Sequence, residues 1–360
     1  MERPLEVVFV HLGTRIPEHL LLNMKRFIKL FPEIPVTLVT DQEYSEREFS
    51  KLLNIWRYSP DSNLDVLNAG RDISYRFGFW RTSIERFFAI SKFHRERAGI
   101  MLLHVESDVL ILPNFPWSEL CSLETLSWNP YNSELDVAGL VLLPSWQHTE
   151  NLVQAISREF VLDNTLNDME ILKRISSSQS PSNTYLRFSP AFEVEKEAEP
   201  ATFPGVFDGA CIGVWLTGQD PRNHFGTVIY HDNTLVERDG TVVNPAEYSY
   251  KTDTLGNIAM VNFAGVEIPL YNLHIHSKNV KLFGDNWKKE LDRLILLSSN
   301  KNVLSEFKID VLWSLLKTVR TPKSFFRLIL TQKSFYNLLL GFKSNHYSLY
   351  QRLRQGFRGL

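Results

Sequence analysis

The chain has 360 residues, 44% of them hydrophobic and 22% charged, and a formal net charge of −2. This is a globular composition, and the length allows one large α/β domain or two smaller ones. Two cysteines are too few for a disulfide framework and indicate a reducing compartment. No apolar run reaches the roughly 18 residues that span a bilayer, and the N-terminus shows no secretory signal, so we expect an intracellular protein.

The first forty residues predict a strand, a helix and a second strand. Apolar residues are continuous in the two strand segments and recur at helical spacing between them. The three segments are residues 6–12, 17–30 and 35–40. A unit of this kind opens a doubly wound sheet, in which helices connect parallel strands. We therefore expect an α/β fold with a doubly wound sheet that is flanked by helices.

Three polar or small residues mark the ends of these two strands. His11 and Gly13 lie at the end of the first strand, and Asp41 follows the second. The carboxyl ends of parallel strands meet at one edge of the sheet, which is where open α/β sheets bind ligands. His11, Gly13 and Asp41 are therefore candidates for binding a nucleotide. For Asp41, the alternative is that its side chain caps a helix or turn ahead of Glu43.

Residues 76–93 predict a helix with an aromatic stripe, which we interpret as core packing. Arg76 and Arg81 lie near the start of this helix, where backbone N–H groups and the helix dipole favour an anion. Both arginines are candidates for charge-assisted hydrogen bonds to a phosphate. Plain solvation at the surface is the alternative for both.

Residues 99–116 are the most informative stretch of the sequence. An apolar run from Ile100 to Val105 ends at Glu106 and Asp108, two carboxylates one residue apart. A continuous apolar run bounded by breakers is typical of a strand that is buried on both faces. In an extended segment, carboxylates at this spacing can point the same way and hold one hard cation, which would neutralise a diphosphate.

Residues 102–108, Leu-Leu-His-Val-Glu-Ser-Asp, resemble the Asp-any-Asp element of nucleotide-sugar glycosyltransferases of the GT-A fold, in the variant whose first acid is Glu. The resemblance implies that Asp108 is the first metal ligand and Glu106 the second, with Mn²⁺ or Mg²⁺ as the ion. It also implies that Ser107, between them, belongs to the site for the nucleotide sugar.

The middle of the chain continues the alternation of strands and helices. Residues 136–143 predict a strand, and residues 149–160 and 166–175 predict amphipathic helices. Residues 176–204 combine a serine-rich segment with an acidic run between prolines. We interpret them as a long flexible loop near the site, because long loops in compact domains often act as lids or bind an acceptor. An insert without a function is the alternative.

Residues 207–218 predict a helix with Asp208 at its N-cap and Gly218 just past its end. This stretch and the following turn, which contains Asp220, resemble a segment of some bacterial polysaccharide glycosyltransferases in which an Asp opens a helix that faces the acceptor. Inverting GT-A enzymes place a catalytic carboxylate in this region of the chain. The resemblance therefore implies Asp208 as the first candidate base and Asp220 as the second. A plain helix cap is the alternative for Asp208.

Residues 266–278 close the predicted catalytic domain. In an extended chain, His274, His276 and Lys278 share one face, and neutral imidazole is an acceptable ligand for ions such as Mn²⁺. Many GT-A enzymes complete the metal site with a late His that is followed by a basic residue near the diphosphate. By this resemblance we expect His276 to bind the metal, with His274 as its helper or substitute, and Lys278 to contact the diphosphate. A histidine pair on an edge strand without a ligand is the alternative.

The last sixty residues differ from the rest of the chain in charge. Residues 301–360 hold 11 lysines and arginines against 2 acidic residues, between clusters of aromatic and aliphatic side chains. Basic amphipathic helices of this kind suit the surface of an anionic membrane. Packing against the catalytic domain or a partner protein is the alternative. No nucleic-acid recognition motif accompanies the charge, so we expect no nucleic-acid partner.

The resemblance implies a GT-A catalytic domain over residues 1–300, with a Rossmann-like, mixed but mostly parallel sheet flanked by helices. The charge pattern predicts a basic amphipathic helical tail over residues 301–360. The resemblance and the tail together imply a metal-dependent glycosyltransferase that moves a sugar from a nucleotide-diphosphate donor to a hydroxyl of a saccharide or lipid-linked acceptor in surface polysaccharide synthesis. Such an enzyme would be cytoplasmic and peripheral on the inner face of the cell membrane. The alternatives are a nucleotidyltransferase acting on sugar phosphates and an inactive, membrane-recruited protein that binds sugar nucleotides.

Overall fold

The structure is a computed structural model that describes most of the chain between residues 4 and 299. The described residues are 4–13, 16–43, 54–60, 78–131, 135–178, 203–218, 236–238, 241–243, 245 and 248–299. The predicted tail, Arg76, Asp220 and residues 179–202 of the predicted loop lie outside them. Among the described helices, none combines the length and the apolar character needed to cross a membrane.

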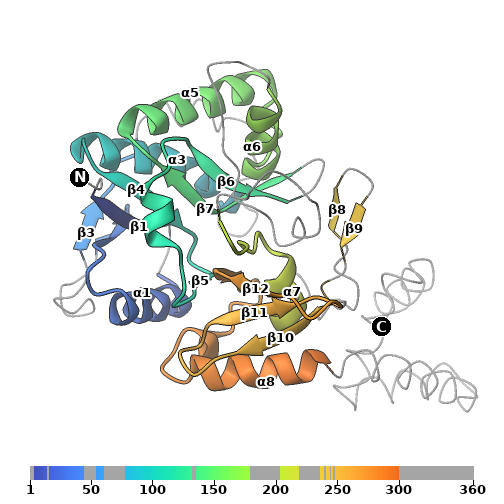
Figure 1. Ribbon diagram of the computed structural model, residues 1–360. Coiled ribbons are helices and arrows are strands. Elements are labelled where there is room, and N and C mark those ends of the chain that lie inside the picture. The colour runs from blue at the N-terminus through green and yellow to red at the C-terminus, as the bar shows by residue number, and fades with distance from the viewer. Residues whose placement is uncertain are drawn as a thin grey trace, which may run out of the picture.

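A six-stranded sheet with the strand order β3-β2-β1-β4-β7-β6 forms the centre of the molecule (Figure 1). Its strands are β1 (Leu5–His11), β2 (Val36–Thr40), β3 (Asn54–Arg57), β4 (Met101–Val105), β6 (Ser127–Pro130) and β7 (Asp136–Leu143). The four strands β3, β2, β1 and β4 are parallel to one another, whereas β7 is antiparallel to both β4 and β6. The predicted α/β fold with a mixed, mostly parallel sheet is therefore confirmed.

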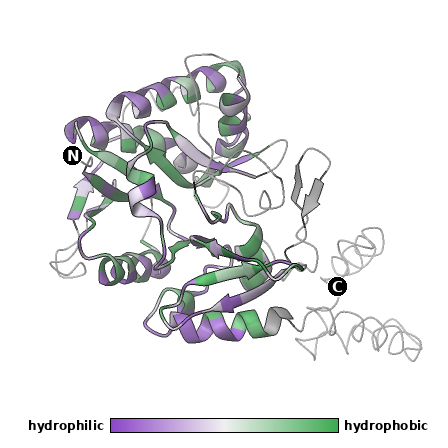
Figure 2. Ribbon diagram, viewed as in Figure 1, coloured by the Kyte–Doolittle hydropathy of each residue, from purple (hydrophilic) through white to green (hydrophobic). Residues whose placement is uncertain are grey.

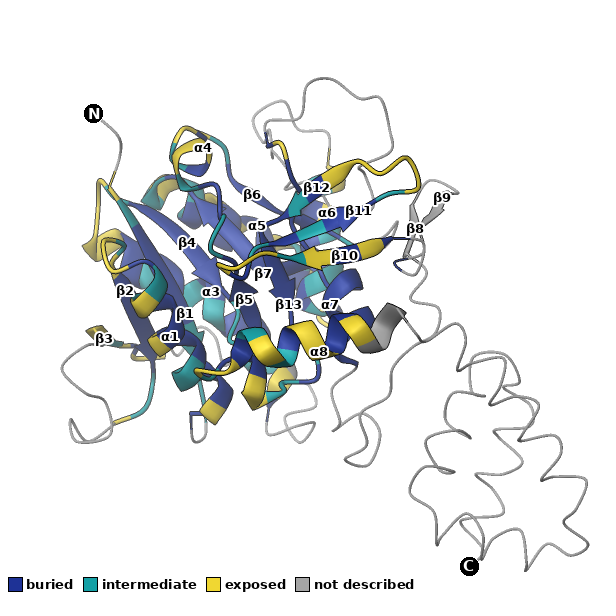
Figure 3. Cartoon of the chain, turned by 60° about the horizontal axis from the view of Figure 1, so that its bottom comes forward, coloured by how far each residue is buried: buried dark blue, intermediate teal, exposed yellow. Residues whose placement is uncertain are grey.

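Helices cover both faces of this sheet, as Figure 1 shows. Helix α1 (Glu18–Leu30) packs on one face. The helices on the other face are α3 (Phe79–Glu96), α5 (Trp146–Leu162) and α6 (Asp168–Ser177). Successive side chains of a strand point to opposite faces, so Leu103 of β4 packs on the α1 side and Leu102 on the α3 side. All five residues of β4 are buried, and Figure 3 shows β4 and β7 in the colour of buried residues.

A third core lies beside the main sheet and was not predicted. Its small antiparallel sheet consists of β10 (Ser249–Thr252), β11 (Ile258–Val261) and β12 (Glu267–Leu270). This sheet packs with α7 (Cys211–Thr217) and α8 (Trp287–Ser299). Figure 2 shows hydrophilic and hydrophobic residues alternating along α8, and Figure 3 shows many of its residues exposed. The three strands have only four residues each and are partly exposed, so they lack the long apolar runs that identify strands in the main sheet.

The remaining described elements are short. They are α4 (Trp117–Cys121), β5 (Val109–Ile111), β8 (Val236–Arg238), β9 (Thr241–Val243), β13 (Asn272–His274) and the 3₁₀ helix η5 (Val280–Leu282). Strands β5 and β13 form an antiparallel ladder in which Val109 pairs with His274. This ladder brings a segment from late in the chain next to the acid pair that ends β4.

Helix α6 continues through Ser177. The first two residues of the loop predicted over 176–204 are therefore helical. Residues 179–202 of that predicted loop lie outside the described residues.

Candidate functional site

Glu106, Ser107 and Asp108 connect β4 to β5 at the carboxyl end of β4. Strands β1 and β2 run parallel to β4 and end at the same edge of the sheet. Open α/β sheets bind ligands at this edge. The predicted placement of the acid pair is therefore confirmed by the topology.

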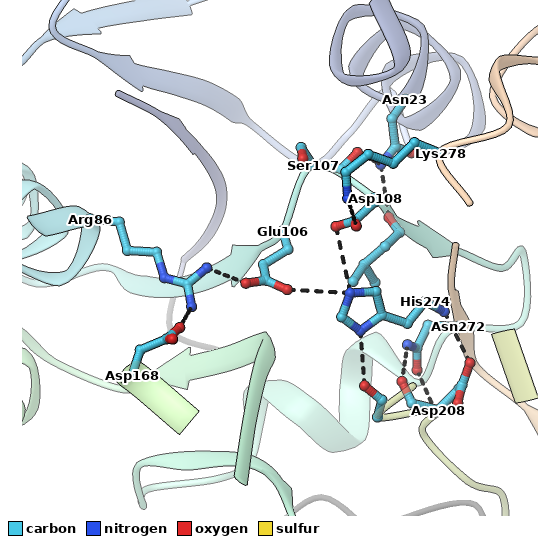
Figure 4. A network of polar contacts seen from close by, with 12 residues as sticks. Asn23, Arg86, Glu106, Ser107, Asp108, Asp168, Asp208, Asn272, His274 and Lys278 are labelled. Carbon is cyan, nitrogen blue, oxygen red and sulfur yellow. Dashed lines mark hydrogen bonds and ion pairs between the residues drawn. The ribbon is translucent and has the colours of Figure 1, made fainter. Parts of the chain in front are cut away.

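The side chains of Glu106, Asp108 and His274 converge on one point (Figure 4). One potential ligand atom from each residue lies within 4.8 Å of the other two. His274 Nε2 is 3.4 Å from Glu106 Oε2 and 3.6 Å from Asp108 Oδ1. Two carboxylates and an imidazole form a ligand set that suits a divalent ion such as Mn²⁺. By their donor chemistry and their convergence, the residues present fit such a cation.

The other oxygen of each carboxylate is bound by a cationic side chain. Arg86 of α3 contacts Glu106 Oε1 and lies 2.5 Å from Asp168 Oδ2. Lys278 Nζ lies 2.5 Å from Asp108 Oδ2. Each acid therefore has one oxygen bound to a cation and turns the other toward His274, which orients both carboxylates before any ion binds.

The surroundings of His274 favour a positive charge. Burial by itself would lower the pKa of His274, but Asp108 and Glu106 outweigh it and raise the pKa to about 9. Burial also opposes ionisation of the two acids. Lys278 and His274 outweigh it at Asp108 and hold its pKa well below the usual range, and Arg86 and His274 lower the pKa of Glu106. Both acids are therefore ionised at neutral pH and available to a cation.

The imidazole of His274 is fixed from its other side. Its Nδ1 lies 2.9 Å from the carbonyl oxygen of Gly209. Because a carbonyl oxygen only accepts, Nδ1 carries a proton, and the second proton of the charged ring lies on Nε2, facing the two acids. When the ring loses the proton on Nε2, the neutral tautomer with its proton on Nδ1 remains. Gly139 leaves room for the ring, since a Cβ there would lie 3.1 Å from His274 Nδ1. This tautomer is the one that a metal at Nε2 requires.

Asp208 lies beneath His274 and is only 1% exposed. Its Oδ1 accepts the Ile212 N–H at 3.0 Å, and its Oδ2 accepts the N–H groups of Gly213 at 2.7 Å and His274 at 3.0 Å. Burial raises the pKa of Asp208, and these backbone bonds offset part of the rise. Helix α7 begins at Cys211, later than predicted, and its N-cap residue is Ala210. Asp208 lies before the N-cap position, but its side chain still accepts N–H groups of the first turn. Asp208 therefore caps α7, which was its alternative role, and also binds the backbone of His274, whereas its role as a catalytic base stays a prediction.

The chain turns after His274, which separates the two histidines. The His276 N–H donates to the carbonyl of His274 at 3.0 Å, and the Lys278 N–H donates to that of Ile275 at 2.9 Å. Lys278 has a left-handed backbone with φ of 51°. The expectation that His274, His276 and Lys278 share one face of an extended strand is therefore wrong.

His276 lies outside the cluster of three, although the sequence pattern favoured it as the ligand. Its ring centroid is 4.4 Å from that of His274. Burial and the neighbouring His274 lower the pKa of His276 to about 3, so its ring is neutral. Within the described part of the chain its Nε2 has no hydrogen-bond partner. It is His274, the predicted helper, that faces the acid pair.

The predicted nucleotide-binding residues lie at the ends of the neighbouring strands. His11 is the last residue of β1, and the Gly13 N–H donates to the two oxygens of Asp41 at 3.0 and 3.1 Å. Gly13 has φ of +94°, a conformation that favours glycine. Asp41 therefore caps the turn after β1, at the same edge of the sheet, and its contact with a nucleotide stays a prediction. Arg81 Nε lies 3.1 Å from Glu85 Oε2.

Arg86 and Asp168 contribute to the site but were not predicted from the sequence. Arg86 stands among the aromatic residues of its helix, and its side chain is only 11% exposed. Asp168 occupies the first turn of α6, directly after the capping residue Asn167. A basic residue inside an aromatic stripe and an acid at a helix start were the available signals. Neither signal shows that the two residues meet.

No family model matches this chain, and no curated protein matches it significantly. The chain is similar in part to several solved glycosyltransferase structures. With the apo-form glycosyltransferase GlyE of Streptococcus pneumoniae TIGR4 it shares 15% identity over 51% of this chain and 45% of that chain, at a TM-score of 0.35. With the galactosyltransferase LgtC in complex with donor and acceptor sugar analogues it shares 14% identity over 46% of this chain and 69% of that chain, at a TM-score of 0.34.

A glycosyltransferase involved in glycosylation of the major capsid of PBCV-1 shares 9% identity with the chain over 51% of this chain and 81% of that chain, at a TM-score of 0.32. The chain thus spans less than half the length of the GlyE structure. The overlaps are partial and the TM-scores low, so the assignment of a function rests on the chain's own side chains.

Proposed function

We propose that this chain is a metal-dependent glycosyltransferase that uses a nucleotide-diphosphate sugar as its donor. The observation that supports this most is the convergence of Glu106, Asp108 and His274 at the carboxyl edge of the sheet, with Lys278 beside them. These three residues would hold Mn²⁺ or Mg²⁺, which when bound stabilises the negative charge of a leaving diphosphate.

Lys278 and Arg86 have different parts in this proposal. The side chain of Lys278 is 24% exposed, and its ammonium is a mobile point charge that suits a phosphate oxygen. We assign it to the diphosphate, for which it would exchange its present bond with Asp108. Arg86 is more deeply buried and is shared between Glu106 and Asp168, so we assign it to orienting Glu106.

The nucleoside part of the donor is proposed to lie along the ends of β1 and β2. His11, Gly13 and Asp41 are placed at that edge by the strands and by the bonds between Gly13 and Asp41. Arg81 and Ser107 remain proposed contacts of the donor. Ser107 Oγ lies 3.2 Å from His19 Nε2.

The acceptor is proposed to be a hydroxyl of a saccharide or of a lipid-linked sugar. The support is the composition of residues 301–360, whose 11 lysines and arginines against 2 acidic residues suit an anionic membrane surface. Asp220 remains a proposed catalytic base, and Arg76 a proposed phosphate contact. Both lie outside the described residues.

Incubation of the full chain with a panel of nucleotide-diphosphate sugars and Mn²⁺ tests this function. We expect release of nucleoside diphosphate from one of them, loss of release on chelation of the metal, and a drop of at least about 100-fold in Asp108→Asn. Asp285→Asn is the matched control, because Asp285 is an exposed acid that pairs with Lys29.

Three results would contradict the proposal. Equal release by the wild type and Asp108→Asn would remove the metal site from the reaction. Pyrophosphate formation from a nucleoside triphosphate and a sugar phosphate would indicate a nucleotidyltransferase. Binding of a sugar nucleotide without turnover, with or without acceptors, would indicate an inactive binding protein.

A further inference from the structure

Within the part of the chain that the structure describes, strand β5 has a backbone ladder on only one of its two edges. Carbonyl groups of successive residues in a strand point to opposite edges. The carbonyl of Asp108 points toward the β13 side, where it accepts the Ile275 N–H at 2.7 Å. The carbonyls of Val109 and Ile111 therefore point away from β13. The residues of β5 are buried, so these carbonyls need other donors.

Two side chains of α1 occupy this open edge in place of a strand. Asn23 Nδ2 donates to the carbonyl of Ser107 at 3.2 Å and to that of Val109 at 2.8 Å. Arg26 Nη1 donates to the carbonyl of Ile111 at 2.7 Å. Asn23 is 1% exposed and Arg26 is 6% exposed. Residues three apart share a helix face, so one side of α1 covers the whole edge.

The two acceptors of Asn23 lie on either side of Asp108 in the chain. From the opposite edge, the carbonyl of Asp108 is bound by Ile275, the residue after His274. The backbone that carries the Asp108 carboxylate is thus fixed from both sides. Figure 4 shows Asn23 on one side of this segment and His274 on the other.

We infer that Asn23 is a positioning residue for the metal site, whose two hydrogen bonds fix the Asp108 carboxylate relative to His274. This inference rests on the proposed function. Arg26 provides an internal control. It binds the same edge of β5 from the same face of α1, but at the carbonyl of Ile111, which is farther from the acid pair. Loss of Arg26 removes the hydrogen bond to Ile111 but leaves the bonds of Asn23 to Ser107 and Val109, on either side of Asp108.

The affinity of the full chain for Mn²⁺ alone, measured by titration calorimetry and by the electron paramagnetic resonance of bound Mn²⁺, tests the inference. Asn23→Leu removes both hydrogen bonds at similar volume, and Arg26→Met removes the bond to Ile111 while keeping the apolar stem. We expect Mn²⁺ affinity to fall about tenfold in Asn23→Leu, with an altered resonance spectrum, and to stay within about twofold in Arg26→Met. Both variants should be less stable than the wild type.

A second variant covers the case in which Asn23→Leu does not fold. Asn23→Ser keeps a donor at this position, and we expect an intermediate loss of Mn²⁺ affinity. Unchanged affinity in the Asn23 variants would overturn the inference, and so would equal losses in Asn23→Leu and Arg26→Met, which would report general destabilisation. A folded wild type that binds no Mn²⁺ would overturn the proposed function itself, and this inference with it.

Discussion

The two strands on either side of Glu106 and Asp108 are stabilised in different ways. Strand β4 lies between β1 and β7 and has a backbone ladder on both edges. Strand β5 has a ladder with β13 on one edge and the side chains of Asn23 and Arg26 on the other. Both strands are packed in apolar cores, but β4 has main-chain bonds on both edges, whereas one edge of β5 depends on side chains of α1.

The largest expected effect comes from the apolar packing of β4. Leu103 is fully buried against the α1 side of the sheet. Leu103→Ala should lower the free energy of unfolding by about 2–5 kcal/mol, because it leaves a cavity in a packed core. Since the ladders on both edges remain, Mn²⁺ affinity should stay within about twofold of the wild type. Urea unfolding and calorimetric titration with Mn²⁺ measure the two quantities.

Leu110→Ala on β5 is the matched variant, since Leu110 is equally buried but packs in the third core. It should cost a similar free energy of unfolding and also weaken Mn²⁺ binding, because β5 has only one ladder. If the two variants lose Mn²⁺ affinity in the same proportion to stability, the distinction between the strands is wrong.

A smaller effect concerns pH and the turn that leads into β4. His94, near the end of α3, lies with Nε2 3.0 Å from the carbonyl of Ile100 and Nδ1 2.7 Å from Thr149 Oγ1. Burial lowers the pKa of His94 below its usual value. The native state therefore keeps this ring neutral, whereas the unfolded chain takes up a proton below about pH 6.5. The contribution of His94 to stability is present above that pH and is lost as the pH falls below it.

His94→Gln tests this by removing the titrating group while keeping an amide that can donate and accept. Urea unfolding at about pH 7 and about pH 5 should show a larger loss of stability in the wild type than in the variant. Parallel losses in the two proteins would show that His94 does not couple the turn to pH.

Much of the main sheet could be predicted because its strands are continuous apolar runs. Residues 136–143 coincide with β7, and the acid pair falls where β4 ends. Local patterns decide these features, since a strand buried on both faces leaves its signature in consecutive residues. The small sheet of the third core lacks such runs because its strands are short and partly exposed.

The arrangement of the site could be predicted only in part, because it depends on contacts between distant segments. The sequence favoured His276 over His274, but the bond from Ile275 to the carbonyl of Asp108 aligns β13 so that His274 faces the acids. Asp208 has the local pattern of a helix cap, and its burial under His274 arises only from the fold. The pairing of Arg86 with Glu106 likewise leaves no trace in residue spacing.

A side-by-side Mn²⁺ titration of His274→Gln and His276→Gln decides whether the ion binds where the three side chains converge. A metal site built on Glu106, Asp108 and His274 predicts a loss of affinity of at least about 100-fold in His274→Gln and a change of less than about tenfold in His276→Gln. Retained binding in a folded His274→Gln, with binding lost in His276→Gln, would contradict it.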